Sequence, residues 1–155
     1  WNIVDVVVIV STEKKEVGST AGQKLVSTSP FFRNRLSRMK DKIKLIKELM
    51  SKKDFTRFGE LIEAEALELH AIMLTSSPSL IYWTPGTLKI MKLCKKWRNE
   101  GLEIYFTINT GQDIHLIIEK KNVEELRARL KAPAQEPHIR RNGDSYFKRA
   151  LFLHL

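Results

Sequence analysis

Apolar residues recur along this chain with two different spacings, which predict strands in some segments and helices in others. From Val4 to Val10 nearly every residue is apolar and β-branched, which is typical of a strand covered on both faces. Between Arg33 and Lys53 the apolar residues recur in steps of three and four, which predicts one long amphipathic helix. Asp54 is a suitable cap for a second long helix, whose apolar stripe continues to about Thr75.

The second half of the chain is predicted to contain shorter helices and strands. The pair Thr84–Pro85 is a favourable helix start, and that helix is expected to end before Gly101. Glu103–Ile108 and Ile114–Glu119 are predicted as two short strands. A last helix is expected over Val123–Leu130.

The remaining segments are predicted as connections. Gly18–Val26 is a polar turn that leads into a short helical segment, and Ala132–Asn142 is a loop rich in proline and charge. Ser76–Pro85 is a connection with a short extended piece at Leu80–Tyr82. One strand, several helices, two strands and a helix together predict an α+β domain, with a mixed or antiparallel sheet and helices packed on one side.

The charge of the chain is strongly basic. Its 155 residues, enough for one domain with a single core, hold 27 Lys and Arg against 18 Asp and Glu, a formal net charge of +9. Much of the surplus lies between Arg33 and Lys53, where it fits the solvated face of the predicted helix. No zinc finger, helix-turn-helix or aromatic RNA-binding strand accompanies it, so nucleic-acid binding is disfavoured. A basic binding module without catalysis stays as an alternative.

Other residue types exclude several classes of protein. The single cysteine, Cys94, rules out an internal disulfide and indicates a reducing compartment such as the cytoplasm. The longest apolar run, Val6–Val10, is too short to cross a membrane. The four histidines lack the spacing of metal ligands: His70, His115, His138 and His154. We therefore expect no metal site and no membrane segment.

Two polar segments and one histidine are candidates for a functional site. Ser19–Gln23 places two hydroxyls and a glycine at the start of a short helix, which suits an anion such as phosphate, although such clusters also make ordinary turns. Asn109–Asp113 joins two predicted strands and is either a plain hairpin turn or a rigidly presented functional tip. His70, in an apolar stretch, is more typical of a buried histidine with a local partner than of a catalytic one.

The chain has no glycine-rich phosphate loop and therefore no nucleotide cradle of its own. It also begins within a predicted strand, at Trp1. We therefore expect it to be a segment of a longer protein.

Four collinear segments resemble the diphosphomevalonate decarboxylase family. Ser11–Phe32 is similar to the family's SAEKK…SST-GM…ETSP stretch, and Lys53–Trp83 to its RDF…F-H-A…PP-I-Y stretch, with His70 on the family's histidine. Glu103–Ile118 resembles A-Y-T-F-D-A-G-P-N-A, and Asn142–Leu151 resembles the NGD-x-F-L-K-G-L insert of eukaryotic-type members.

This resemblance implies a fold, a reaction and partners. Residues 1–155 would form the ferredoxin-like C-terminal domain of a GHMP kinase superfamily enzyme, beside an N-terminal domain that binds ATP and Mg²⁺. The family phosphorylates the 3-hydroxyl of 5-diphosphomevalonate and then releases phosphate and carbon dioxide, giving isopentenyl diphosphate. The implied partners are this small phosphorylated substrate, the N-terminal domain and a second copy in a homodimer.

The resemblance also implies site residues. Asn109 stands at the family's catalytic aspartate, and a neutral amide cannot act as a base. Thr110 and Gly111 belong to the same substrate-binding tip. Near the substrate's diphosphate we expect three residues, with the basic surface steering the anion: Ser19, Thr20 and Gly22.

Several further positions depart from the family pattern. Asp113 stands where the family has asparagine, so it is a candidate to replace the missing carboxylate, and Gln112 replaces a proline. Glu65, Ala66 and Leu67 replace the family's Asp-Ser-Asn. These changes imply impaired decarboxylation, or a kinase similar to mevalonate 3-kinases. In either case the tip with Asn109 and the hydroxyls after Gly18 are expected to line one cleft.

Overall fold

The computed structural model describes residues 1–11, 18–131 and 149–154 of the chain. Its centre is a four-stranded sheet made of β1 (Ile3–Ile9), β2 (Ile104–Thr107), β3 (Ile114–Glu119) and β4 (Arg149–His154). The strand order is β2-β3-β1-β4, and all three neighbouring pairs are antiparallel. This order, with helical connections after β1 and β3, is that of a ferredoxin-like domain.

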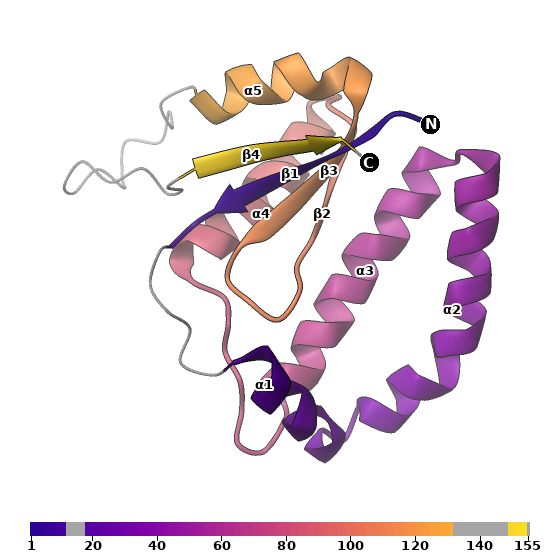
Figure 1. The fold of residues 1–155 in the computed structure, drawn as a ribbon, viewed down its shortest axis with the longest axis vertical. Helices are drawn as coiled ribbons and strands as arrows, with labels where there is room; N and C mark the ends of the chain where they lie inside the picture. Colours follow the sequence, from indigo (N-terminus) through magenta and orange to yellow (C-terminus); the bar gives the residue numbers. More distant parts are fainter. Residues whose placement is uncertain (12–17, 132–148, 155) are drawn as a thin grey trace.

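Within the described residues, five α-helices connect or flank these strands (Figure 1). Between β1 and β2 lie α1 (Ser19–Leu25), the 3₁₀ turn η1 (Val26–Thr28) and three longer helices, α2 (Phe32–Lys52), α3 (Phe55–Leu74) and α4 (Pro85–Asn99). The 3₁₀ turn η2 (Lys120–Asn122) and α5 (Val123–Lys131) follow β3.

Local sequence signals account for the ends of the long helices. The Asp54 carboxylate accepts a hydrogen bond from the Arg57 amide at the start of α3, as predicted. Thr84 and Thr87 form a reciprocal capping box at the start of α4, where Pro85 takes the first helical position. After α4, Gly101 adopts a φ of 97°, which glycine tolerates best.

Most predicted elements are confirmed, with two differences. Leu80–Tyr82 lies in a connection, as expected, whereas β4 was not predicted from the apolar pattern. The strand expected over Glu103–Ile108 is shorter, because only residues 104–107 pair with β3. The predicted loop at Ala132–Asn142 lies outside the described residues.

The sheet buries its main core against α4 and α5. Alternate residues of β1, Val4, Val6 and Val8, are completely buried in this core, together with Cys94 of α4 and Leu126 of α5. The intervening residues face the other way. The opposite face of the sheet therefore contacts α3 in a second cluster, whose buried members are Ile3, Phe55, Tyr105 and Ile117. The α+β class is confirmed. The prediction that helices pack on one side of the sheet is correct for α4 and α5, but α3 packs on the opposite face.

A buried ion pair joins α3, α4 and β2. The Arg98 guanidinium makes two bonds to the Glu63 carboxylate, at 2.9 and 3.1 Å, although Glu63 is only 7% exposed. Arg98 also donates to the carbonyl of Ile104 and lies over the Tyr105 ring, 4.6 Å from its centroid. These contacts tie both helices to the β2 end of the sheet.

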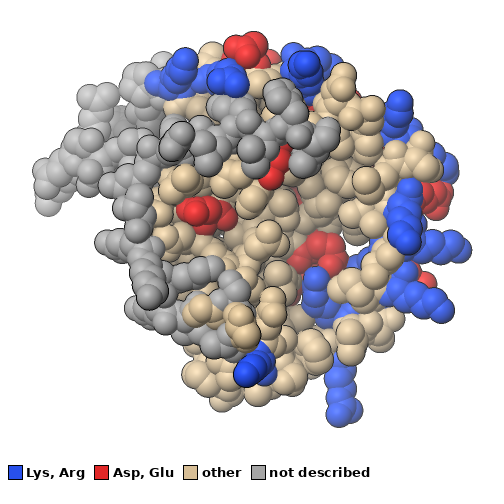
Figure 2. Space-filling view, in the orientation of Figure 1, with Lys and Arg blue, Asp and Glu red and all other residues tan. Residues whose placement is uncertain are grey.

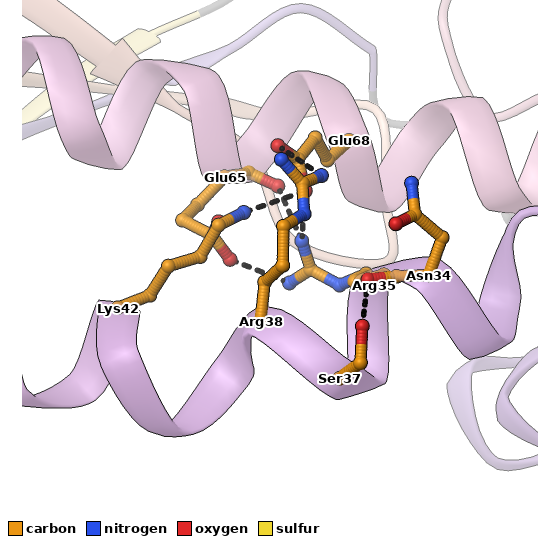
Figure 3. Close-up of polar contacts among 7 residues, drawn as sticks. All are labelled: Asn34, Arg35, Ser37, Arg38, Lys42, Glu65 and Glu68. Carbon is orange, nitrogen blue, oxygen red and sulfur yellow. Dashed lines mark hydrogen bonds and ion pairs between the residues drawn. The ribbon is translucent and has the colours of Figure 1, made fainter.

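A second, more exposed network holds α2 against α3 (Figure 3). Arg35 and Lys42 of α2 both form ion pairs with Glu65 and Glu68 of α3, and Arg38 pairs with Glu68 at 3.2 Å. The helix predicted to carry a solvated basic face thus turns three of its cations toward a neighbouring helix. Its outer surface still exposes a row of apolar side chains at intervals of seven, Leu36, Ile43 and Met50.

Candidate functional site

The loop between β2 and β3 is fixed by contacts from outside the sheet. The last residues paired between β2 and β3 are Thr107 and His115, and Ile114 pairs with Val8 of β1, so strand pairing does not hold residues 108–113. Instead, the Thr87 hydroxyl of α4 donates to the Gln112 carbonyl at 2.7 Å. The Gln112 side-chain amide donates to the carbonyl of Ser11, beyond the end of β1, at 3.2 Å. The tip predicted from Asn109 to Asp113 is therefore more than a plain hairpin turn.

Asn109 presents its side chain at the surface of this tip while its carbonyl is held. The residue is exposed, whereas Ile108 before it is buried in the core. The Asn109 carbonyl accepts hydrogen bonds from the amide of Gly111, at 2.8 Å, and from the Nε2 of His70, at 3.1 Å. Thr110 and Gly111 are half-buried next to it.

Asp113, the candidate replacement for the missing carboxylate, has a structural contact. Its Oδ1 accepts a hydrogen bond from the amide of Val10 at 3.2 Å, which joins the tip to the end of β1. The residues that stand for the family's Asp-Ser-Asn do not supply a carboxylate to the tip either. Glu65 turns toward α2 and its ion pairs, and Ala66 is buried.

His70 lies in a buried aromatic environment beneath the tip. The residue is 1% exposed, and its ring lies 4.8 Å from the Trp83 ring and 6.4 Å, edge-on, from the Tyr82 ring. Burial lowers the pKa of His70 to about 4, against the smaller opposing effect of its bond to Asn109. The interpretation of His70 as a buried histidine with a local partner is thus confirmed, and the partner is the tip itself.

The second candidate segment, α1, packs on the same aromatic cluster. The helix starts at Ser19, Thr20 is exposed, and Gly22 is buried. A Cβ atom on Gly22 would overlap the Tyr82 hydroxyl, so glycine allows α1 to approach this ring. Tyr82 in turn contacts His70, which bonds Asn109, so two side chains link α1 to the tip, and Figure 1 shows the hairpin extending toward α1.

Because of this close approach, we expect Gly22→Ala to lower the free energy of unfolding by about 1–3 kcal/mol, since overpacking forces α1 and Tyr82 apart. Gly18→Ala is the matched control, because a Cβ atom at that position has nothing within 4 Å and the backbone there is extended. Urea unfolding of both variants measures the difference. Equal stabilities of the two variants would show that α1 does not rest on Tyr82.

The face of the sheet opposite α4 and α5 carries an ion pair that the sequence analysis missed. The Nδ1 of His115 lies 2.8 Å from the Oδ2 of Asp5, on neighbouring strands. The hydrogen bond to Asp5 raises the pKa of His115, against the effect of burial. The sequence did contain a signal for this pair, because Asp5 interrupts the apolar pattern of β1. A carboxylate that is buried in a sheet requires a polar partner.

The surface charge is not concentrated on the tip. Figure 2 shows Lys and Arg gathered mainly over α2 and α5, while the middle of the same face is largely uncharged with a few acidic side chains. On this face the Lys and Arg side chains lie away from the largely uncharged middle, and the expectation of a basic surface around the site stays a prediction. Among the described residues no group of three or more His, Cys, Asp or Glu could hold a metal ion. None of the helices in that part of the chain is long and apolar enough to span a bilayer.

The fold and the fixed tip define a ferredoxin-like α+β domain with a candidate site on the β2–β3 loop. Comparison with family models identifies it further, since residues 5–151 match the mevalonate 5-diphosphate decarboxylase C-terminal domain. The chain therefore belongs to this family.

Individual relatives support the same assignment. The chain is 35% identical over 131 residues to a diphosphomevalonate decarboxylase of Aspergillus fumigatus, covering 82% of this chain and 32% of the relative. The solved mevalonate diphosphate decarboxylase from Enterococcus faecalis matches with a TM-score of 0.77 and 30% identity, over 86% of this chain and 40% of the other. A structure described as "MDDEF in complex with MVAPP, AMPPCP and Magnesium" matches with a TM-score of 0.80 and 28% identity. The match covers 99% of this chain and 46% of the other.

The match is limited to one part of these relatives. This chain spans about a third of the length of the curated decarboxylases that it resembles. It spans less than half of the solved structures.

Proposed function

We propose that this chain is the C-terminal domain of an ATP-dependent enzyme that acts on 5-diphosphomevalonate, and that position 109 faces the substrate's 3-hydroxyl. The observation that carries the proposal is the fixed tip. Asn109 stands where the family has its catalytic aspartate, on a loop held by α3, α4 and the end of β1. Such support is what a residue needs in order to act on a reacting atom.

The proposal assigns substrate contacts to the same region. Thr110 and Gly111 would contact the substrate from the tip, while Ser19 and Thr20 at the start of α1 would bind its diphosphate. Exposure of Thr20 is consistent with this role. The close packing of Gly22 against Tyr82 explains why a glycine is needed at this position. We therefore do not assign Gly22 a substrate contact.

ATP and Mg²⁺ are proposed to bind outside this chain. The described residues do not fit a nucleotide site, because they hold no metal-binding cluster and the sequence has no glycine-rich phosphate loop. An N-terminal domain would supply both, as a partner across the active site. We also propose a homodimer and a cytoplasmic location. The single, buried thiol of Cys94 supports the location.

The neutral amide of Asn109 favours a second candidate, a kinase similar to mevalonate 3-kinases. Asp113 accepts a backbone hydrogen bond at the end of β1, which supports a structural role rather than a substitute for the missing carboxylate. Without a carboxylate at the tip, deprotonation of the 3-hydroxyl loses its base. This loss slows phosphorylation itself, so the kinase candidate rests on the resemblance to mevalonate 3-kinases, which also lack this aspartate and phosphorylate without decarboxylation.

The experiment that separates these candidates is an assay of the whole protein that contains this chain, with ATP and 5-diphosphomevalonate. ADP released together with carbon dioxide identifies a decarboxylase, and ADP alone identifies a kinase. Ser19→Ala is expected to weaken substrate binding severalfold, because one charge-assisted hydrogen bond is lost. No ADP release and no affinity for 5-diphosphomevalonate would leave the basic binding module as the explanation.

A further inference from the structure

The Asn109 carbonyl has two donors, and one of them comes from a distant helix. Gly111 donates from within the tip, as a neighbouring residue in a turn can. His70 donates from α3, 39 residues away in sequence. A carbonyl oxygen has two lone pairs, so both acceptor positions of this peptide group are used. This arrangement is found at the residue that the proposed function places next to the substrate.

These contacts restrict the backbone on both sides of Asn109. Ile108 is 1% exposed in the main core, so the residue before Asn109 cannot move independently of the sheet. The peptide group after it is held through its carbonyl by His70. With φ and ψ fixed in this way, the Asn109 side chain is left with the few staggered orientations of its own χ angles.

The His70 ring is itself held in one orientation. Trp83 lies against its face at a tilt of 33°, and Tyr82 meets it edge-on at 85°. Because a carbonyl can only accept, the Nε2 of His70 must carry the proton that it shares with Asn109. At a pKa of about 4 the His70 imidazole is neutral at pH 7.

We propose that His70 is a positioning residue, which donates from Nε2 to the Asn109 carbonyl and thereby sets the direction of the side chain at position 109. The effect of His70 on turnover rests on the proposed function. Its effect on the orientation of the Asn109 side chain does not depend on that function. A histidine that only filled space in the core would have no effect on position 109 beyond a general loss of stability.

The kinetic test uses substitutions at His70 in the whole protein, assayed with ATP and 5-diphosphomevalonate. His70→Phe keeps a ring between Trp83 and Tyr82 but removes the donor, and we expect kcat to fall by roughly 10- to 100-fold while KM changes by less than about threefold. His70→Gln retains an N–H donor and is expected to recover part of kcat.

A buried position on the same helix provides the control. Ile72 is 2% exposed and its side chain has no hydrogen-bond donor, so Ile72→Val removes a buried methyl group but no hydrogen bond to the tip, and its kcat should stay within about twofold of the parent. An unchanged kcat in His70→Phe, or an equal loss in Ile72→Val, would overturn the proposal.

A spectroscopic test is independent of catalysis. Imidazole ¹⁵N shifts of this chain should show a proton on Nε2 and a bare Nδ1 of His70 from pH 5.5 to 8, and His70→Phe should shift the amide signals of residues 109–111. If no variant of the whole protein turns over substrate while these signals behave as expected, the proposed function fails and the positioning of Asn109 stands. A proton on Nδ1, or unmoved tip signals, would refute the positioning itself.

Discussion

Replacing Arg98 by alanine is expected to lower the free energy of unfolding by about 3 kcal/mol or more, the largest stability effect predicted for this chain. The substitution leaves the Glu63 carboxylate, 7% exposed, without the two bonds that it receives from Arg98. It also removes the cation that lies over Tyr105 and the donor to the Ile104 carbonyl. Urea unfolding, followed by circular dichroism, measures the change.

Two controls separate the buried charge from the loss of an arginine as such. Arg38→Ala removes a cation that is 52% exposed, and its cost should stay within about 0.5 kcal/mol. In the double variant Glu63→Leu with Arg98→Met no charge is left unpaired, so it should be more stable than Arg98→Ala alone. If Arg98→Ala cost no more than Arg38→Ala, the ion pair would contribute nothing to the joint between α3, α4 and β2.

Introducing a carboxylate at the tip should produce the largest functional effect. Asn109→Asp in the whole protein is expected to raise turnover of 5-diphosphomevalonate by about 100-fold or more, because general-base groups typically contribute this much. The tip is already fixed around position 109, so the new side chain needs no other rearrangement. Coupled assays of ADP and of carbon dioxide measure phosphorylation and decarboxylation separately.

Asn109→Ser is the control for this prediction, since it changes the side chain without adding a base. Its turnover should not rise, and the gain in Asn109→Asp should disappear at acidic pH as the new carboxylate becomes protonated. If Asn109→Asp brings no gain, the family's chemistry has been lost at other positions as well. The residues that replace the Asp-Ser-Asn motif, from Glu65 to Leu67, are the first to consider.

Periodicity and caps were sufficient to predict most of the helices and strands. The apolar spacing and Asp54 defined α2 and α3, and Thr84 with Pro85 defined α4. These signals are local, since each depends on residues within one or two turns. The strand β4 was missed because its register is set by long-range pairing with β1, which a local pattern does not contain.

The sequence was sufficient to predict where the candidate site lies, but not which contacts hold it in place. The Asn-Thr-Gly sequence at 109–111 and the family resemblance pointed to the tip. The bond between His70 and Asn109 spans 39 residues, and that between Val10 and Asp113 spans 103. Such contacts follow from the folded arrangement of α3, β1 and the hairpin. Likewise, no spacing rule could have paired Asp5 with His115 across two strands.

The polar attachment of α2 has a consequence for how the domain opens. Arg35, Arg38 and Lys42 hold this helix through partly solvated ion pairs, while Leu49 is its single buried residue. Dissolved salt weakens such partly covered pairs less than fully exposed ones, but it leaves apolar packing largely intact. At high ionic strength α2 should therefore detach in brief local excursions, with its amide protons exchanging before those of α3, while the sheet and the tip remain folded.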